Sequence, residues 1–370
     1  MIFKNCTFFN EMFEKEVGDI KVENGKIAEI GFFNEGGVDM SGCLVLPGFV
    51  DIHIHGGEGA DFSDGDTASF DAMSRYLAKH GVTSFCGTTM TLSQDKLRRI
   101  VSAAADYTAP KSKLVGINLE GPYIAMSKKG AQNAEYVRAG SVDEVRELYS
   151  ICDKIKLITI APEAFDSAEF IKEVSRFMSV SVGHSAANAE QCRTAFENGA
   201  NHITHLFNAM TPMTHREAGI VGTAFDNDNV MCEIICDGEH ICPTVLRNSF
   251  DILGEDRACV ISDSMRGAGV GEGEFELGGQ MTYVKPGYKV AKLADGTIAA
   301  SITNVFDEFK NLLSFGIDFK TALKSCTINP ARSIGEQDNI GSIAVGKCAD
   351  FIVTDENFNI KEVYINGTLA

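Results

Sequence analysis

From residue 47 to about residue 344, the pattern of hydrophobic and polar positions alternates between one typical of buried strands and one typical of helices. Eight short apolar runs read as buried strands, and the segments between them, such as 67–81 and 186–200, have apolar residues at spacings of three and four and end at or next to glycine, as amphipathic helices do. The eight runs are GFVDIHIH, VTSFCGTT, LVGINLEG, KLITIAPE, SVSVGHS, HITHLFNAM, VMCEIICDG and ACVISDS. Eight such units predict a closed (β/α)8 barrel.

The two ends of the chain follow a different pattern. Residues 1–46 and 345–370 contain short apolar stretches separated by turn signals such as Asn-Gly and Gly-Lys, which is typical of small antiparallel units. We expect both ends to pair into one small β domain. The predicted fold class is therefore α/β: a (β/α)8 TIM-type barrel at 47–344 with a small β-sandwich domain formed by 1–46 and 345–370.

Polar residues stand where the predicted barrel strands end. His53 and His55 are one residue apart in PGFVDIHIHG, and alternate residues of a strand share a face. Further along the chain, four more predicted strand ends supply Glu120, His184, His205 and Asp263. Because active sites of such barrels lie at the carboxyl ends of the strands, we expect these six side chains to converge at one rim.

Four imidazoles and two carboxylates at one rim predict a metal centre. Nitrogen and oxygen ligands without thiolates suit one or two divalent ions, Zn²⁺ or Fe²⁺ and also Mn²⁺. For a single such histidine, hydrogen bonding in the core would be the better explanation. The chain has only eight histidines, and four of them at strand ends favour metal binding over packing.

The other four histidines are interpreted one by one. His202 is three residues from His205, which in a strand is the opposite face, so we expect it to pack against a helix. His80 closes a predicted helix, where a cation interacts favourably with the helix dipole. His215 is expected in a solvated loop. His240, in CDGEH just beyond the seventh strand, is expected at the barrel mouth.

Composition limits the partners and the compartment. The formal charge of -18 disfavours nucleic acid and anionic membrane surfaces, and an acidic ligand would need a local basic group. No apolar run approaches the length of a membrane span, and the first residues lack the order of a signal peptide. Eleven cysteines without a repeated CxxC fit a reducing compartment. We expect a cytoplasmic protein.

The assembled motifs resemble the N-acetylglucosamine-6-phosphate deacetylases of the amidohydrolase superfamily over essentially the whole chain. The shared motifs, in family order, are PGFVDIHIHG, GVTSFCGTT, INLEGPYI, KKGAQN, ITIAPE, VGHSAA, THLFNAM, REAG, CDGEH, ISDS and VGKCADFIV. The series LEGP, GHS and HLFNAM is specific to a much smaller group of proteins than HxH, which is common across the superfamily. The resemblance implies a metal-dependent barrel, a homodimer, and hydrolysis of N-acetylglucosamine-6-phosphate to glucosamine-6-phosphate and acetate.

The resemblance also implies roles for individual residues. Glu120, His184 and His205 match the ligands of the main metal, and His53 and His55 would add a second metal site. Asp263 matches the general base and acid. The positions that match substrate contacts are Ala131, Gln132, Asn208, Ala209, Arg216, His240, Ile298, Ala299 and Ala300. In the family, the arginine commonly reaches in from the partner subunit.

Two positions depart from the family pattern. The family's KGxH histidine is replaced by Gln132, which can donate a hydrogen bond but cannot become charged, so phosphate affinity or sugar identity is expected to differ. A family glycine before a serine is replaced by Ala300, and its methyl group is expected to narrow the pocket beside the acetyl group.

Other reactions remain alternatives. Relatives with similar ligands include an N-acetylgalactosamine-6-phosphate deacetylase, acyl amino acid deacylases and cyclic-amidine deaminases. The deaminases take a glutamate from an HxxE stretch that GHSAAN does not offer, and many cyclic amidases use a carboxylated lysine, whereas Lys156 stands at the start of its predicted strand, away from the rim. A non-catalytic barrel scaffold is a further alternative, although such proteins usually lose metal ligands first.

Overall fold

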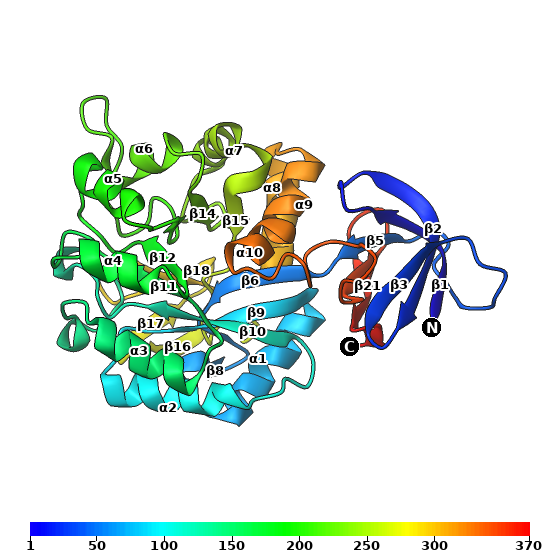
Figure 1. The fold of residues 1–370 in the computed structure, drawn as a ribbon, viewed down its shortest axis with the longest axis horizontal. Coiled ribbons are helices and arrows are strands. Elements are labelled where there is room, and N and C mark those ends of the chain that lie inside the picture. The colour runs from blue at the N-terminus through cyan, green and yellow to red at the C-terminus, as the bar shows by residue number, and fades with distance from the viewer.

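A computed structural model describes all residues, 1–370, as a barrel with a separate smaller sheet at one end (Figure 1). Eight strands form the barrel sheet in the order β15-β14-β13-β12-β11-β10-β9-β6, and every neighbouring pair is parallel. The strands are β6 (Phe49–Ile54), β9 (Val82–Thr89), β10 (Lys113–Glu120), β11 (Ile155–Ile160), β12 (Ser179–Val182), β13 (His202–Ile203), β14 (Met231–Ile234) and β15 (Ala258–Val260). These are the eight predicted runs, so the barrel is confirmed.

The first and last barrel strands meet through backbone hydrogen bonds beyond the ends of the ladder. The amide of Asp263 donates to the carbonyl of His53 over 2.9 Å, and the amides of His55 and Gly56 donate to the carbonyl of Ser264 over 2.9 and 3.0 Å. The chain therefore nearly closes the barrel at the point where three predicted site residues lie.

Helices surround the barrel and cover its outer face. They are α1 (Thr67–Lys79), α2 (Gln94–Ala105), α3 (Val142–Ile151), α4 (Ala168–Val174), α5 (Ala189–Glu197), α6 (Gly219–Phe225), α7 (Pro243–Arg257), α8 (Val305–Phe315), α9 (Phe319–Cys326) and α10 (Ile328–Ser333), with 3-10 turns at Phe62–Asp64, Met126–Lys128 and Ala134–Tyr136. In α1, Asp66 caps the helix through the amide of Ser69, and Phe70, Met73 and Leu77 form a buried stripe.

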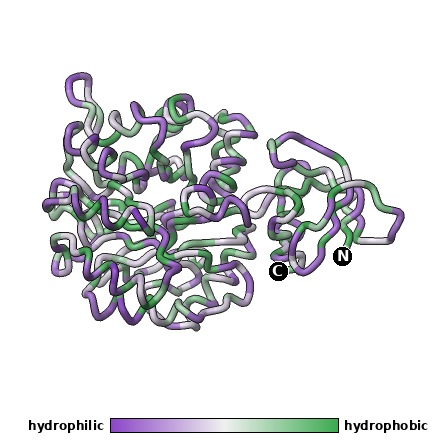
Figure 2. Tube along the Cα trace, viewed as in Figure 1, coloured by the Kyte–Doolittle hydropathy of each residue, from purple (hydrophilic) through white to green (hydrophobic).

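Burial of apolar side chains separates the core from the loops. One cluster of 75 buried residues joins the barrel strands to the surrounding helices, and a separate cluster of 10 joins other strand residues, such as Val50 and Cys259, to Ala331 in α10. Figure 2 shows hydrophilic segments along much of the periphery and hydrophobic stretches inside. No helix is long and apolar enough to cross a membrane.

The two chain ends lie side by side in a second sheet. Its strands are β1 (Ile2–Phe9), β2 (Lys15–Glu23), β3 (Lys26–Gly31), β4 (Val38–Asp39), β5 (Leu44–Pro47), β20 (Phe351–Thr354), β21 (Ile360–Ile365) and β22 (Thr368–Leu369). They form one sheet in which β20 pairs antiparallel with β5, around a core that includes the mutually packed rings of Phe3, Phe351 and Tyr364.

A four-stranded antiparallel sheet between β15 and α8 was not expected from the sequence. It comprises β16 (Gly273–Leu277), β17 (Gln280–Val284), β18 (Val290–Lys292) and β19 (Ile298–Ser301). A short pair, β7 (Gly56–Gly57) and β8 (Ala60–Asp61), follows β6. The longer excursion brings Ile298 and Ala299 back to the mouth of the barrel.

Candidate active site

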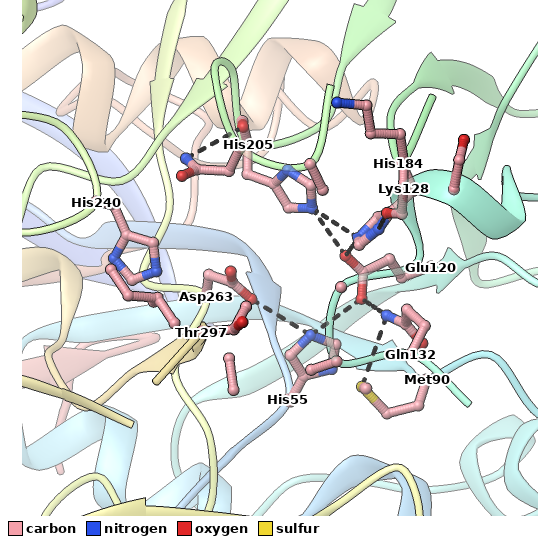
Figure 3. A pocket seen from close by; sticks show the side chains of 17 residues that line it. His55, Met90, Glu120, Lys128, Gln132, His184, His205, His240, Asp263 and Thr297 are labelled. Atoms are coloured by element: carbon pink, nitrogen blue, oxygen red, sulfur yellow. Dashed lines mark hydrogen bonds and ion pairs between the residues drawn. The ribbon is translucent and has the colours of Figure 1, made fainter. Parts of the chain in front are cut away.

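A cavity of about 290 Å³ opens where the barrel strands end, a size near the lower end of the range for small-molecule sites (Figure 3). Twelve of the predicted site residues line it, namely His55, Glu120, Ala131, Gln132, His184, His205, Asn208, Ala209, His240, Asp263, Ile298 and Ala299. His53 lies beneath the cavity wall and is fully buried. The fold therefore brings together predicted site residues from the ends of six different barrel strands.

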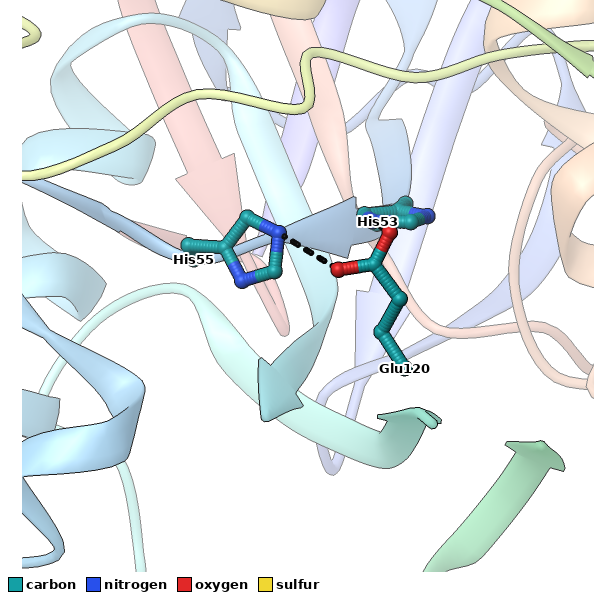
Figure 4. Close-up of side chains that lie close together, drawn as sticks. All are labelled: His53, His55 and Glu120. Carbon is teal, nitrogen blue, oxygen red and sulfur yellow. Dashed lines mark ion pairs between the residues drawn. The ribbon is translucent and has the colours of Figure 1, made fainter. Parts of the chain in front are cut away.

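Glu120, the last residue of β10, lies at the centre of the site. Its two carboxylate oxygens face the two rings of the HxH pair, as Figure 4 shows. His53 Nε2 is 3.5 Å from Oε1, and His55 Nε2 is 3.2 Å from Oε2. These three buried residues offer ligand atoms close enough to share one ion.

The same carboxylate also faces a second pair of imidazoles. His184 Nε2 and His205 Nε2 are each 3.0 Å from Glu120 Oε1 and 3.1 Å from each other. Glu120, His184 and His205 are thus a second group of buried side chains that could hold an ion. Because Glu120 belongs to both groups, two ions held here would share one carboxylate.

Local backbone conformation turns three of these side chains toward the cavity. His184, His205 and Asp263 have φ values of 45°, 30° and 45°, in the left-handed region that residues other than glycine seldom adopt. Each stands just after a barrel strand, where the chain must turn sharply. Such strain at a cluster of functional side chains persists only when surrounding contacts hold it.

Neighbouring groups set the orientation of the imidazoles. His184 Nδ1 is 2.8 Å from the carbonyl of Lys128, and His55 Nδ1 is 3.3 Å from the carbonyl of Thr88. A carbonyl only accepts, so in both rings Nδ1 carries a proton, and Nε2 is the nitrogen on Glu120's side of the site that could coordinate an ion in the neutral ring. Backbone carbonyls commonly orient metal-binding histidines in this way.

The electrostatics of the centre favour a bound cation. Burial raises the pKa of Glu120, but His53 and His184 lower it by more, so its pKa lies well below the usual range. Burial lowers the pKa of His55, but Asp263 and Glu120 outweigh this and raise it to about 10. The cluster thus holds its carboxylates ionised and stabilises positive charge between them.

The donor set fits a divalent metal ion. His53 Nε2 is buried, has no hydrogen-bond partner and points to the same space as the other Nε2 atoms. Imidazole nitrogens and a carboxylate without thiolates are the ligands of Zn²⁺, Fe²⁺ and Mn²⁺ sites. A buried ring nitrogen without a partner costs free energy that coordination of an ion would recover.

Asp263 stands beside the HxH pair at the end of β15. Its Oδ1 is 3.3 Å from His55 Nε2 and 3.5 Å from His53 Nε2, and its side chain lines the cavity. Burial raises its pKa, but His55 and His53 lower it by more, and its pKa lies below the usual value. Asp263 is therefore ionised and can accept a proton from a molecule in the cavity.

His240 also lines the cavity, beside Asp263 and on the side away from Glu120 (Figure 3). Its Nδ1 is 2.7 Å from Asp237 Oδ2, and both residues belong to the CDGEH turn after β14. Burial raises the pKa of Asp237, but the hydrogen bond and charge of His240 lower it by more. The ionised carboxylate fixes the ring and leaves Nε2 free for a ligand, as expected for a residue at the mouth.

Gln132 has a different neighbourhood from the one expected of a phosphate contact. It is buried at the cavity wall, where its amide nitrogen donates to Glu120 Oε2 and its Oε1 accepts from the amide of Thr91 over 2.7 Å. Its side chain therefore supports the central carboxylate.

Two predicted substrate contacts lie outside the cavity of this chain. Arg216 is exposed in the loop between β13 and α6. Ala300 is fully buried and belongs to the hydrophobic core, so the structure contradicts the expectation that its methyl group narrows the pocket. The chain leaves the cavity wall after Ala299, and Ala300 pairs with Ala291 of β18, where it is enclosed by other core residues.

The expectation for His202 was also wrong. Its Nε2 lies 3.3 Å from Glu233 Oε1, and both side chains are buried next to the metal-site residues. The count of three residues to His205 failed because β13 contains only His202 and Ile203, and the chain leaves strand geometry before His205.

Several residues of the site were not among those predicted from the sequence. Lys128 lines the cavity, and its Nζ donates to the carbonyl of Met210 over 3.2 Å. Glu163, in the ITIAPE motif, accepts from Ser185 Oγ and the amide of Ala186 and so holds the loop after His184. Lys156 pairs with Glu336, away from the site, as predicted.

Known proteins resemble the chain along its length. The amidohydrolase family model matches residues 44–370, and the N-acetylglucosamine-6-phosphate deacetylase of Bacillus subtilis is 34% identical over 88% of this chain and 84% of that protein. This chain belongs to the N-acetylglucosamine-6-phosphate deacetylases of the amidohydrolase family. As an amidohydrolase it is a hydrolytic enzyme, and the scaffold alternative is not favoured.

Solved structures of deacetylases have the same fold. The N-acetylglucosamine-6-phosphate deacetylase of Thermotoga maritima is 32% identical, with a TM-score of 0.90 over 100% of this chain and 99% of that one. A mutant of the enzyme from Mycobacterium smegmatis, solved in complex with N-acetyl-D-glucosamine-6-phosphate, is 27% identical, with a TM-score of 0.92 over 100% and 98% of the two chains. The amidohydrolase barrel and its accessory sheet are therefore shared with these enzymes.

Proposed function

We propose that this protein hydrolyses N-acetylglucosamine-6-phosphate to glucosamine-6-phosphate and acetate. One observation carries the proposal: a proton-accepting carboxylate, Asp263, lies beside two overlapping groups of metal-binding side chains in a cavity of small-molecule size. The solved deacetylases with the same fold support the substrate class.

The two groups around Glu120 would hold one or two divalent ions. His184 and His205 would complete one site, and His53 and His55 the other. A divalent ion held there would lower the pKa of a coordinated water from about 15.7 to about 7 and would polarise a carbonyl oxygen. We propose Zn²⁺ or Fe²⁺, with Mn²⁺ as the third option.

Asp263 would move the proton that amide hydrolysis requires. As an ionised carboxylate at the cavity wall, it accepts a proton from the attacking water. It then donates that proton to the departing amine nitrogen, which is a poor leaving group until it is protonated. His240, held by ionised Asp237, offers Nε2–H in its protonated form to a negatively charged oxygen of the substrate.

The phosphate group needs positive charge in this acidic chain. Lys128 is a lysine on the cavity wall, and we propose that Arg216 of a second subunit supplies a guanidinium, whose planar fork suits phosphate oxygens. Exposure of Arg216 in a single chain supports this assignment. The working enzyme would then be a homodimer, which we place in the cytoplasm because none of its eleven cysteines is paired.

The substrate assignment is tested by acetate release from three compounds. Metal-loaded protein is given N-acetylglucosamine-6-phosphate, N-acetylgalactosamine-6-phosphate and unphosphorylated N-acetylglucosamine. We expect turnover of the first compound, and Asp263→Asn should lower kcat by about 100- to 10,000-fold because it removes the proton acceptor without changing its shape. Preferential turnover of the galactosamine compound, or of none, would refute the proposal.

The shared site is tested by subunit complementation. Arg216→Ala and Asp263→Asn subunits are each prepared, unfolded together and refolded as a mixture. A mixed dimer contains one site with an intact Asp263 and an intact partner arginine, so the mixture should regain activity that neither variant has alone. A mixture no more active than the separate variants would place Arg216 outside the partner's site.

A further inference from the structure

Glu233 is a fully buried carboxylate that the metal-site motifs do not include. It stands in β14, with its side chain inside the barrel below the ligand cluster. Its Oε2 is 2.9 Å from His53 Nδ1 and accepts from the backbone amide of His205 over 3.2 Å. One carboxylate thus contacts a residue of each of the two metal-binding groups.

The contact with Glu233 determines which nitrogen of His53 is available. An ionised carboxylate only accepts, so His53 Nδ1 must carry the proton that lies between them. His53 Nε2 then has a free lone pair, and this atom points to Glu120 and Asp263 at 3.5 Å from each. A carboxylate behind a histidine ring fixes the tautomer and raises the basicity of the ligand nitrogen.

The surroundings of Glu233 are arranged to keep it charged and in place. Its second oxygen, Oε1, has no hydrogen bond and faces His202 Nε2 at 3.3 Å. A buried anion is costly unless it is paired, and the imidazoles of His53 and His202 flank this one on both sides. The row His202–Glu233–His53 therefore connects the interior of the barrel to the HxH site.

We propose that Glu233 is a positioning residue that holds His53 as an Nε2 ligand and thereby gives the His53–His55–Glu120 group its affinity for a second metal ion. The inference rests on the proposed function, because it assumes that the cluster binds metal. The ring of His184 has another support, the carbonyl of Lys128, and Glu233 contacts His205 only through the backbone amide, so loss of the Glu233 charge should affect the HxH group more than the main site.

The test is the zinc stoichiometry of Glu233→Gln at controlled free zinc, measured by equilibrium dialysis and elemental analysis. Glutamine keeps the shape of the side chain and removes its charge. We expect two equivalents in the wild type and one in the variant over a range of free zinc, because the affinity of the weaker site should fall about 10- to 100-fold. The proposal would be overturned if the Glu233→Gln variant bound two zinc ions with wild-type affinity. It would also be overturned if the wild-type protein never bound more than one zinc ion per chain.

A double variant tests the pathway through His53. If Glu233 acts through that ring, Glu233→Gln combined with His53→Gln should lose no more affinity than His53→Gln alone, whereas additive losses would contradict the mechanism. The matched control is Glu308→Gln, since Glu308 is equally buried and has one unpartnered oxygen but contacts the amide of Cys236 instead of a ligand. The control should bind two ions.

Folding and catalysis are separated from the result. Circular dichroism shows whether Glu233→Gln folds. If it does not, His202→Gln takes its place, and this variant should also weaken metal binding at the second site. Unchanged metal binding in His202→Gln would then overturn the proposal. Zinc binding is measured without substrate. A protein that binds two ions through Glu233 but releases no acetate would refute the proposed reaction and leave this inference intact.

Discussion

Gln132 shows how a residue's role depends on the neighbour that its side chain reaches. The family motif predicts a substrate contact at this position, and the residue does line the cavity. Its two polar ends are already engaged, however, by Glu120 and by the amide of Thr91. Gln132 thus acts on the metal centre through Glu120 and has little capacity left for phosphate.

We therefore expect Gln132→Ala to weaken metal binding by about 10-fold, because it removes a hydrogen bond that orients a ligand carboxylate. The ratio of kcat/KM for phosphorylated over unphosphorylated N-acetylglucosamine should stay near the wild-type ratio. Metal titration and steady-state kinetics measure both quantities. If the kcat/KM ratio fell sharply while metal affinity stayed unchanged, Gln132 would instead be a phosphate contact.

Among the elements, the β16–β19 sheet contributes most to the shape of the cavity beyond the barrel itself. Its last strand supplies Ile298 and Ala299 to the wall. Its second strand begins with Gln280, whose amide nitrogen donates to the carbonyls of Ala131 and Gln132. The β16–β19 sheet is thus hydrogen-bonded to the loop that contains part of the predicted substrate site.

Gln280→Ala should loosen this loop. We expect KM for the sugar phosphate to rise several-fold with a smaller change in kcat, because the reacting groups on the barrel strands remain in place. Met281→Ala, an exposed change in the same strand, is the control and should behave like the wild type. An unchanged KM in Gln280→Ala would show that these hydrogen bonds do not shape the substrate site.

The accessory sheet has its own buried carboxylate, Asp19 in β2. It accepts from Lys4 Nζ over 2.6 Å and from the amides of Asn5 and Phe33 over 2.9 Å each. Burial raises the pKa of Asp19, but these hydrogen bonds lower it by more, to below the usual value of 3.8. Stability from a carboxylate with a depressed pKa is present above the unfolded pKa and is lost as the pH falls through the folded pKa.

Asp19→Asn should therefore lower the free energy of unfolding at pH 7 by about 1 kcal/mol, since Lys4 lies near the surface, where solvent screens the pair. The difference from the wild type should shrink below pH 3.8 and disappear at lower pH. Urea unfolding at pH 7 and pH 3 measures it, with the exposed Glu29→Gln in β3 as control. A difference that is independent of pH would refute the role of the charge.

At the scale of the whole molecule, the proposed metal site would connect distant parts of the barrel. The ligand groups come from β6, β10, β12 and β13, and Asp263 follows β15. Bound ions would therefore cross-link strands from both halves of the barrel sheet, and they bind only the folded chain. Such binding stabilises the folded state in proportion to its affinity.

Removal of metal by a chelator should lower Tm, and restoring Zn²⁺ at 100 times its Kd should recover about 2.7 kcal/mol for each site. Calorimetry on stripped and reloaded protein measures the change. His184→Gln should lose most of the response of the main site. Equal Tm values with and without metal would show that the cluster does not bind ions in the folded protein.

Periodicity and strand-end chemistry determined much of this protein. The alternation of apolar runs and amphipathic segments predicts the eight parallel strands, because a continuous apolar run suits a strand buried on both faces and an amphipathic segment suits a helix that buries one. Polar residues at the ends of these strands indicate the site, since parallel strands bring their carboxyl ends to one rim. His53, His55, Glu120, His184 and Asp263 could therefore be placed together without a structure.

Only the tertiary structure decided which side chains touch. The partnership of Glu233 with His53 and His202 depends on the register of β6, β13 and β14, which the sequence of one strand does not contain. The failure at His202 has the same origin, because the residue count assumed a strand that in fact ends after two residues. Local patterns specify which face a residue occupies, whereas contacts across the barrel depend on strand register and on how each strand ends.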